Sequence, residues 1–123
     1  MISICKRFHF DAAHYLPDYV GKCHNLHGHR WFVDVCVKGD LQTEGPQKGM
    51  VMDFGDLKKF VEKYIIERFD HTLLNEVFLD SPTAENLSEY AGLTIERFLP
   101  MNVDLEFVRV WETEDAYAEW RRE

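Results

Sequence analysis

The chain has 123 residues, 46% of them apolar, and a formal net charge of -8. This length corresponds to one domain over residues 1–123. Nine Phe, five Tyr and three Trp provide enough apolar volume for a hydrophobic core, so the size of the chain alone requires no disulfide or structural metal. The acidic charge argues against nucleic acid and anionic membranes as partners. No apolar run approaches the ~18 residues of a membrane span, and residues 1–7 become charged too early for a secretion signal. We therefore expect a cytoplasmic protein.

The odd number of cysteines, Cys5, Cys23 and Cys36, is typical of a reducing compartment where thiols stay free or take part in chemistry. Cys5 and Cys36 lie within predicted strands, so we expect them to be small buried apolar side chains. Cys23 lies in a histidine-rich segment and is the candidate for a chemical role.

The first half of the chain favours two strands, over residues 2–10 and 29–38. The second shows alternation at period two, with one face formed by Trp31, Val33, Val35 and Val37. Glycines and a proline between residues 39 and 49 indicate a loop, and residues 50–54 read as a short extended piece. A helix capped by Asp53 is predicted to run to about Phe69, because apolar residues recur there at helical spacing.

The second half favours one helix and two strands. Ser81 suits the cap of the helix, Pro82 its first position, and Pro100 ends it. Alternation returns over residues 103–111, and residues 116–121 fit a short strand. Strands segregated from helices predict an α+β fold with a four-stranded antiparallel sheet and two helices on one face. Such an open sheet has two free edges and one bare face, so oligomerisation is expected.

The candidate chemistry concentrates in a histidine cluster. His27 and His29 are separated by Gly28, and residues i and i+2 of a strand point to the same side. His14 follows the first strand, and a hairpin would bring it beside the pair. Three neutral imidazoles suit Zn²⁺, at ~2.0–2.1 Å per bond, and leave one position open as in catalytic sites.

Spacing alone leaves alternatives open at this cluster. His9 and His24 lie close enough in the chain to compete as ligands. Cys23, four residues before His27, is either a fourth ligand that closes the site or an unligated thiol. Near a metal and Lys22, such a thiol is suited to act as a base or nucleophile.

Five short motifs in order along nearly the whole chain resemble the 6-pyruvoyl-tetrahydropterin synthase and 6-carboxy-tetrahydropterin synthase family. The combination of Cys-x₃-His-Gly-His with Asp-His is specific, although neither part is specific alone. The motifs occupy residues 10–16, 23–29, 69–75, 82–86 and 111–113.

The resemblance implies a tunnelling fold, in which trimers close a barrel and two trimers stack as a homohexamer with active sites at subunit interfaces. It also implies a residue set. Zinc ligands are His14, His27 and His29; catalytic residues are Cys23, Asp70 and His71; substrate-binding residues are Glu112, Thr83 and Glu85. In that arrangement Glu112 anchors the pterin, and Glu112 and Thr83 meet a neighbour's zinc and Cys23.

The family substrate is 7,8-dihydroneopterin triphosphate. We expect the 6-carboxy branch, a zinc-dependent lyase that releases triphosphate and acetaldehyde and serves 7-deazaguanine and queuosine synthesis. The alternatives are the 6-pyruvoyl branch, without carbon loss, and a non-catalytic, zinc-stabilised pterin-binding oligomer. The acidic chain requires a local cluster of cations for the triphosphate, with Lys22, Arg30 and Lys48 as candidates.

Overall fold

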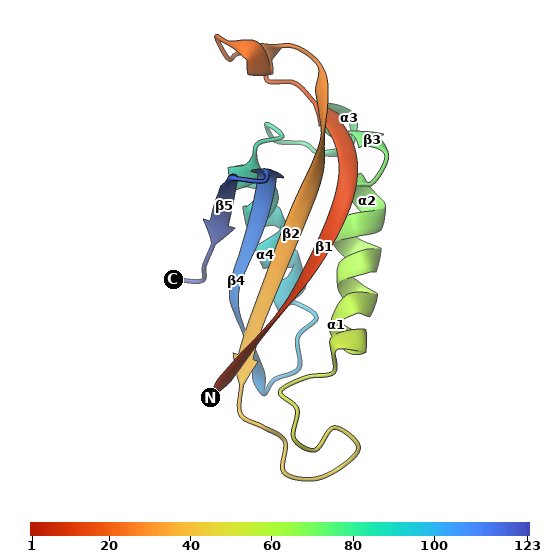
Figure 1. Cartoon of the computed structure of the whole chain (residues 1–123), viewed down its shortest axis with the longest axis vertical. Coiled ribbons are helices and arrows are strands. Elements are labelled where there is room, and N and C mark those ends of the chain that lie inside the picture. The colour runs from red at the N-terminus through yellow and green to blue at the C-terminus, as the bar shows by residue number, and fades with distance from the viewer.

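A computed structural model describes all residues 1–123 and contains one mixed sheet in the order β3-β1-β2-β4-β5 (Figure 1). β1 (Ile2–His14) and β2 (His27–Gly39) form a long antiparallel hairpin. β4 (Val103–Thr113) pairs with β2, and β5 (Ala116–Trp120) with β4, both antiparallel. The predicted four-stranded antiparallel arrangement is therefore present. The structure adds β3 (Thr72–Leu73), which runs parallel to β1 and is too short to leave a pattern in the sequence.

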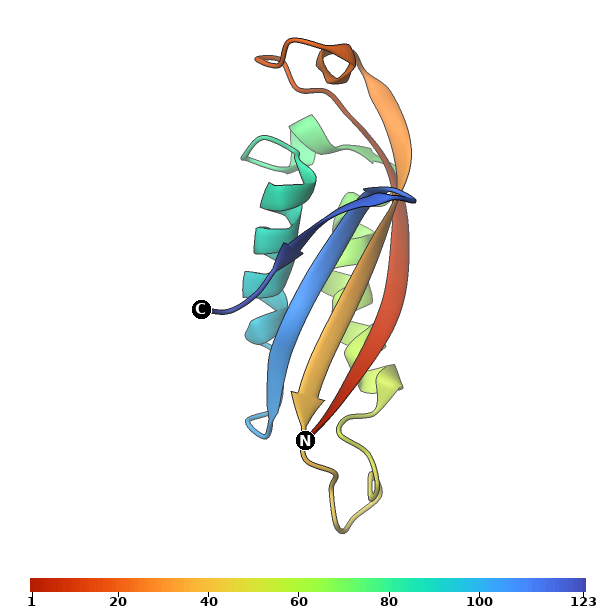
Figure 2. The same ribbon diagram turned by 60° about the vertical axis from the view of Figure 1, so that its left-hand side comes forward.

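The helices cover one face of this sheet, as predicted, and leave the other face bare (Figures 1 and 2). A continuous helical stretch follows the Asp53 cap, whose carboxylate accepts a hydrogen bond from Gly55 N at 2.6 Å. It comprises α1 (Phe54–Val61), the π-helical η2 (Glu62–Ile66) and α2 (Glu67–Phe69). The remaining helical segments are η1 (Lys22–His24), α3 (Leu74–Val77) and α4 (Ala84–Glu96). None combines the length and apolar composition needed to cross a bilayer.

The predicted start of the second long helix is wrong by two residues. Thr83 is the N-cap of α4, because its hydroxyl accepts a hydrogen bond from Asn86 N at 3.1 Å. Pro82 lies before the helix, and Ser81 O accepts a bond from the Asn86 side chain at 3.0 Å. Ser and Thr are both good caps, so composition alone did not distinguish position 81 from position 83.

The core lies between the sheet and the helices. Alternate residues of β1, starting with Phe8 and Phe10, and Trp31, Val33 and Val35 of β2 are buried in one core cluster with residues of the helices. Strand side chains alternate between faces, so the same buried row continues to His14 at the end of β1. The alternation therefore directs a polar, fully buried ring to the helix-covered face.

The bare face is built from ion pairs and aromatic rings instead of an apolar layer. Arg7 binds Asp34 through two hydrogen bonds of 2.7 and 3.0 Å, and Trp111 Nε1 donates to the same carboxylate at 2.8 Å. The Arg7 guanidinium also lies over the Phe32 and Trp111 rings. Such a face stays hydrated without neighbours, and the sheet is not closed within one chain.

Cys5 and Cys36 form a disulfide on this bare face, as register partners of the β1–β2 hairpin with Cα atoms 4.1 Å apart. The expectation of small buried side chains therefore holds for Cys36 but is wrong for Cys5, which is exposed, and the two sulfurs are joined. The pairing follows from the strand register that also pairs His14 with His27. Cys23 is the free cysteine.

Gly92 of α4 marks a close contact with β5. A Cβ atom at this position would lie 2.8 Å from Trp120 Cζ3 and closer still to two other atoms of the indole. Helix propensity alone favours Ala over Gly by about 1 kcal/mol, but overcrowding at a packed contact costs about 1–3 kcal/mol. We expect Gly92→Ala to lower the free energy of unfolding in urea. The exposed Glu89→Ala on the same helix is the control, and a variant as stable as wild type would contradict this packing.

Candidate active site

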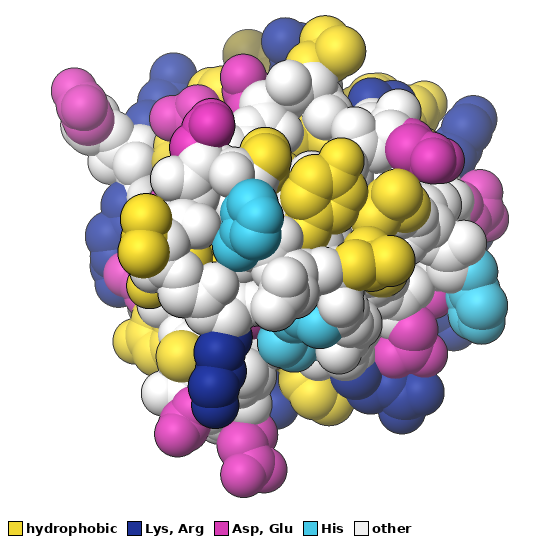
Figure 3. Space-filling model, turned by 90° about the horizontal axis from the view of Figure 1, so that it is seen from above, with side chains coloured by type: hydrophobic (Ala, Val, Ile, Leu, Met, Phe, Trp, Pro, Cys, Tyr) yellow, Lys and Arg dark blue, Asp and Glu magenta, His cyan; other side chains and the backbone are white.

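Three histidines meet where the β1–β2 hairpin ends. His14 and His27 are register partners in the last pair of the ladder, and His29 follows His27 on the same face. His14 is fully buried, and the other two rings are partly buried. The predicted convergence of these residues is therefore present. Seen from above in Figure 3, this end of the molecule exposes histidine next to hydrophobic side chains.

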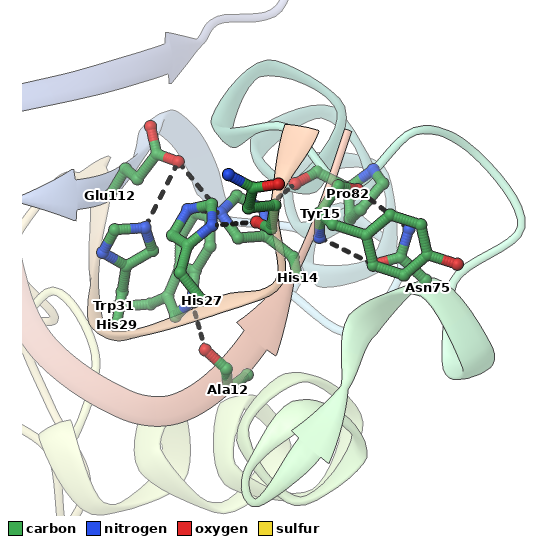
Figure 4. A network of polar contacts seen from close by, with 10 residues as sticks. Ala12, His14, Tyr15, His27, His29, Trp31, Asn75, Pro82 and Glu112 are labelled. Atoms are coloured by element: carbon green, nitrogen blue, oxygen red, sulfur yellow. Dashed lines mark hydrogen bonds and ion pairs between the residues drawn. The ribbon is translucent and has the colours of Figure 1, made fainter. Parts of the chain in front are cut away.

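Backbone carbonyls orient two of the rings, as Figure 4 shows. His14 Nδ1 donates to Pro82 O at 2.8 Å, and His27 Nδ1 donates to Asn25 O at 2.7 Å. Because a carbonyl only accepts, each ring carries its proton on Nδ1 and directs an Nε2 lone pair inward. The two Nε2 atoms lie 3.0 Å apart. Two lone pairs at this separation repel unless a cation or proton lies between them.

Glu112, near the end of β4, completes the group. Its Oε1 lies 3.1 Å from His14 Nε2 and 3.7 Å from His29 Nε2. The ligand atoms of these residues and His27 all lie within 4.8 Å of one another. Glu112 thus contacts the histidines of its own chain, and its expected placement at a neighbour's cluster is wrong. The β2–β4 register, which no local pattern encodes, determines this position.

The donor set fits a metal ion. His29 Nε2 is buried and has no hydrogen-bond partner, which is unfavourable unless a ligand satisfies it. Burial, the largest effect, lowers the pKa of both His14 and His29 below the usual value. The rings are therefore neutral near pH 7, which is the form that binds metals.

Cys23 lies outside this group of ligand atoms. It belongs to η1, in the segment that joins β1 to β2, and its carbonyl accepts a bond from Leu16 N at 2.7 Å. The fourth candidate ligand is therefore Glu112. His24 also lies outside the group and bonds Pro17 O at 3.0 Å, while His9 points to the bare face beside Phe32.

Asp70 and His71 form the predicted pair, with Asp70 Oδ2 2.9 Å from His71 Nδ1. The main chain of Asp11 holds both residues: its N–H donates to Asp70 Oδ1 at 2.9 Å, and its carbonyl accepts from His71 N at 2.7 Å. The hydrogen bond from Asp11 N, followed by that from His71, lowers the pKa of Asp70. His71 adopts a positive φ of 59°, which is uncommon outside glycine.

This pair is not part of the ligand group of the same chain. His71 lines a shallow, open cavity with Gly28, His29 and Arg30 of β2. Gly28 and Arg30 alternate with His27 and His29 along the strand, so this cavity lies at the end of the sheet, beside the histidine cluster and not within it. His71 is also 81% exposed.

The other predicted binding residues lie beside the start of α4. Glu85 and Glu112 line one cavity of about 400 Å³ with Tyr117 and Glu119 of β5. Thr83 uses its hydroxyl as the helix cap. Sequence reasoning missed Asn75, whose side chain binds Tyr15 N at 3.0 Å and Tyr15 O at 2.9 Å and so fixes the end of β1. Its place in the motif over residues 69–75 was the available signal.

Fold and site together define an α+β protein with a His₃Glu group that could hold a metal ion at one end of its sheet and an acidic cavity beside it. Residues 3–123 match the family model described as 6-pyruvoyl tetrahydropterin synthase, and the chain belongs to this family. It is 34% identical to 6-carboxy-5,6,7,8-tetrahydropterin synthase of Haemophilus influenzae, across 98% of this chain and 99% of that one.

Two further comparisons bear on the assignment. Dihydroneopterin monophosphate aldolase of Pyrococcus furiosus is 37% identical, across 89% of this chain and 88% of that protein. The structure of Caenorhabditis elegans 6-pyruvoyl tetrahydropterin synthase superposes with a TM-score of 0.84 at 24% identity, and covers 99% of this chain and 96% of that one. The structural match demonstrates the shared fold.

Proposed function

We propose that this protein is a zinc-dependent lyase that converts 7,8-dihydroneopterin triphosphate to 6-carboxy-5,6,7,8-tetrahydropterin, with loss of acetaldehyde and triphosphate. In this role it serves 7-deazaguanine and queuosine biosynthesis in the cytoplasm. The observation that supports it most is the convergence of three imidazoles and Glu112, with His29 Nε2 left unpartnered. The second support is the alignment of this chain, along nearly its full length, with a relative named for this reaction.

In this proposal His14, His27 and His29 hold the zinc, and Pro82 O and Asn25 O keep two of the rings in the ligating tautomer. Bound zinc supplies Lewis acidity to the hydroxyl-bearing side chain of the substrate. Cys23, as an unligated thiol, removes a proton from that side chain. His71, held by Asp70, handles the second proton transfer.

The proposal requires more than one copy of the chain. The Asp70–His71 pair is not part of the ligand group of its own chain and His71 is largely exposed, so we assign the pair that serves one metal site to a neighbouring copy. The free edges of the sheet, along most of β1 and along β5, are available for such assembly. A trimer that closes a barrel, or a dimer of trimers, meets this requirement.

Pterin recognition is assigned to the cavity between α4 and β5. A pterin presents its 2-amino group and N3–H side by side, and one carboxylate accepts both hydrogen bonds. Glu112 and Glu85 both line this cavity. We assign the anchoring role to Glu112, which in the working enzyme then leaves the fourth metal position to the substrate, and a supporting role to Glu85, with Thr83 shaping the start of α4.

Product analysis tests the assignment. We expect zinc-loaded protein to convert dihydroneopterin triphosphate to the 6-carboxy product with one acetaldehyde per turnover. A pyruvoyl product without acetaldehyde would instead indicate the 6-pyruvoyl branch. The Pyrococcus relative supports a second candidate, an aldolase acting on the monophosphate. Turnover of the monophosphate alone would favour that activity, and turnover of neither substrate would indicate a non-catalytic pterin-binding protein.

A further inference from the structure

Arg30 is the cation that lies beside the Asp70–His71 pair. It is the register partner of Asp11 on the bare face, and its Nε and Nη2 donate to the two carboxylate oxygens of Asp11 at 2.9 and 3.1 Å. Arg30 and His71 line the same shallow, open cavity, to which His29 of the histidine cluster also contributes. Asp11 therefore connects both sides of this cavity, since its main chain binds Asp70 and His71 while its side chain binds Arg30.

The ion pair leaves half of the guanidinium available. The N–H of Nε and one N–H of Nη2 form one edge of the guanidinium and bind Asp11. Both N–H groups of Nη1 and the second N–H of Nη2 form the outer edge and are free to donate to a ligand. The Arg30 side chain is 57% exposed. Ala13 and Gly28, which also line the cavity, add little bulk in front of it. Asp11 thus fixes an arginine whose outer edge matches the paired oxygens of a phosphate.

We propose that Arg30 binds the polyphosphate of a substrate whose hydroxyl-bearing side chain lies at a neighbouring copy's metal site. The inference rests on the proposed function, which assigns the Asp70–His71 pair to that neighbouring site. In dihydroneopterin triphosphate the phosphate ester is joined to the carbon next to the hydroxyl-bearing carbons. A group that acts on those hydroxyls therefore has the first phosphate close by, and Arg30 is the arginine beside His71.

The other candidate cations are less well placed. Lys48 lies in the loop between β2 and α1, at the end of the sheet opposite the histidines (Figure 1). Lys22 lies in η1, on the segment that contains Cys23, and lines none of the cavity that contains His71. Because Asp11 offsets the charge of Arg30, the arginine acts through contact hydrogen bonds and not through long-range attraction in this acidic chain.

The test compares Arg30→Ala and Arg30→Lys with wild type on zinc-loaded protein. For Arg30→Ala we expect the KM for dihydroneopterin triphosphate and the inhibition constant of inorganic triphosphate to rise about tenfold or more. Turnover at saturation, and the inhibition constant of phosphate-free dihydroneopterin, which carries no leaving group and can only compete for the site, should change little. Arg30→Lys should fall between, because an ammonium keeps the charge but loses the planar fork. Arg7→Ala, which removes a carboxylate-bound arginine elsewhere on the same face, should behave as wild type.

Calorimetric titration of inorganic triphosphate into the same proteins separates this inference from the proposed function. If wild type turns over no pterin but binds inorganic triphosphate more tightly than Arg30→Ala does, the function fails and the phosphate site stands. Equal affinities for wild type and Arg30→Ala, an equal loss in Arg7→Ala, or no binding to wild type would overturn the inference. Zinc content, measured for each variant, must match wild type, because His29 precedes Arg30 in the chain.

Discussion

His27→Ala is expected to lose bound zinc and nearly all turnover. The substitution removes one of three imidazoles from the cluster, and structural zinc sites derive several kcal/mol from each ligand. We expect zinc affinity to fall well over 100-fold, since even the loss of an outer hydrogen-bond partner costs about 10–100-fold. The turnover number should drop about 1,000-fold or more. We choose His27 for this substitution because His14 is fully buried, and replacing His14 would also leave a cavity beside Trp31.

Metal content and competition with a chelator measure this effect. His24→Ala is the matched control, because His24 lies three residues earlier, bonds Pro17 O, and is absent from the ligand group. That variant should retain stoichiometric zinc and wild-type turnover. Stoichiometric zinc of unchanged affinity in His27→Ala would show that the imidazoles do not form the metal site.

Cys23→Ala is expected to keep its zinc and lose turnover by about 100- to 10,000-fold, the usual contribution of a positioned acid or base. The zinc should stay because Cys23 is not among the atoms within 4.8 Å that form the ligand group. Elemental analysis and steady-state rates on the same preparations measure both quantities. Loss of zinc from Cys23→Ala would identify the thiol as a ligand and favour a non-catalytic, zinc-stabilised protein.

Mixing Cys23→Ala with His71→Ala tests the origin of the second catalytic pair. Each variant alone should be nearly inactive. In mixed oligomers, sites that combine Cys23 from one chain with His71 from another become complete, so random assembly should restore about a quarter of wild-type activity. Activity that stays at the level of the single variants would mean that both groups act within one chain.

The histidine cluster was accessible from sequence because it depends on local rules. Strand alternation puts His27 and His29 on one face, and a hairpin between consecutive strands brings His14 to them. Glu112 and β3 depend on pairing between elements far apart in the chain, which a single sequence does not display. The Cys5–Cys36 pairing follows from the same β1–β2 register that pairs His14 with His27. The Asp70–His71 motif was visible, but its placement outside the ligand group follows from the path of the chain after α2.

The hydrogen bond between His14 and Pro82 couples the electron-donating strength of the His14 ring to the position of α4. The carbonyl that polarises the ring belongs to the residue just before the Thr83 cap, so α4 and the imidazole share one stretch of main chain. A displacement of the first turn of α4 would loosen that bond and make the ring a poorer electron donor. Binding in the acidic cavity, which Glu85 of the same turn lines, would then change the affinity of the histidine cluster for a metal ion without direct contact with it.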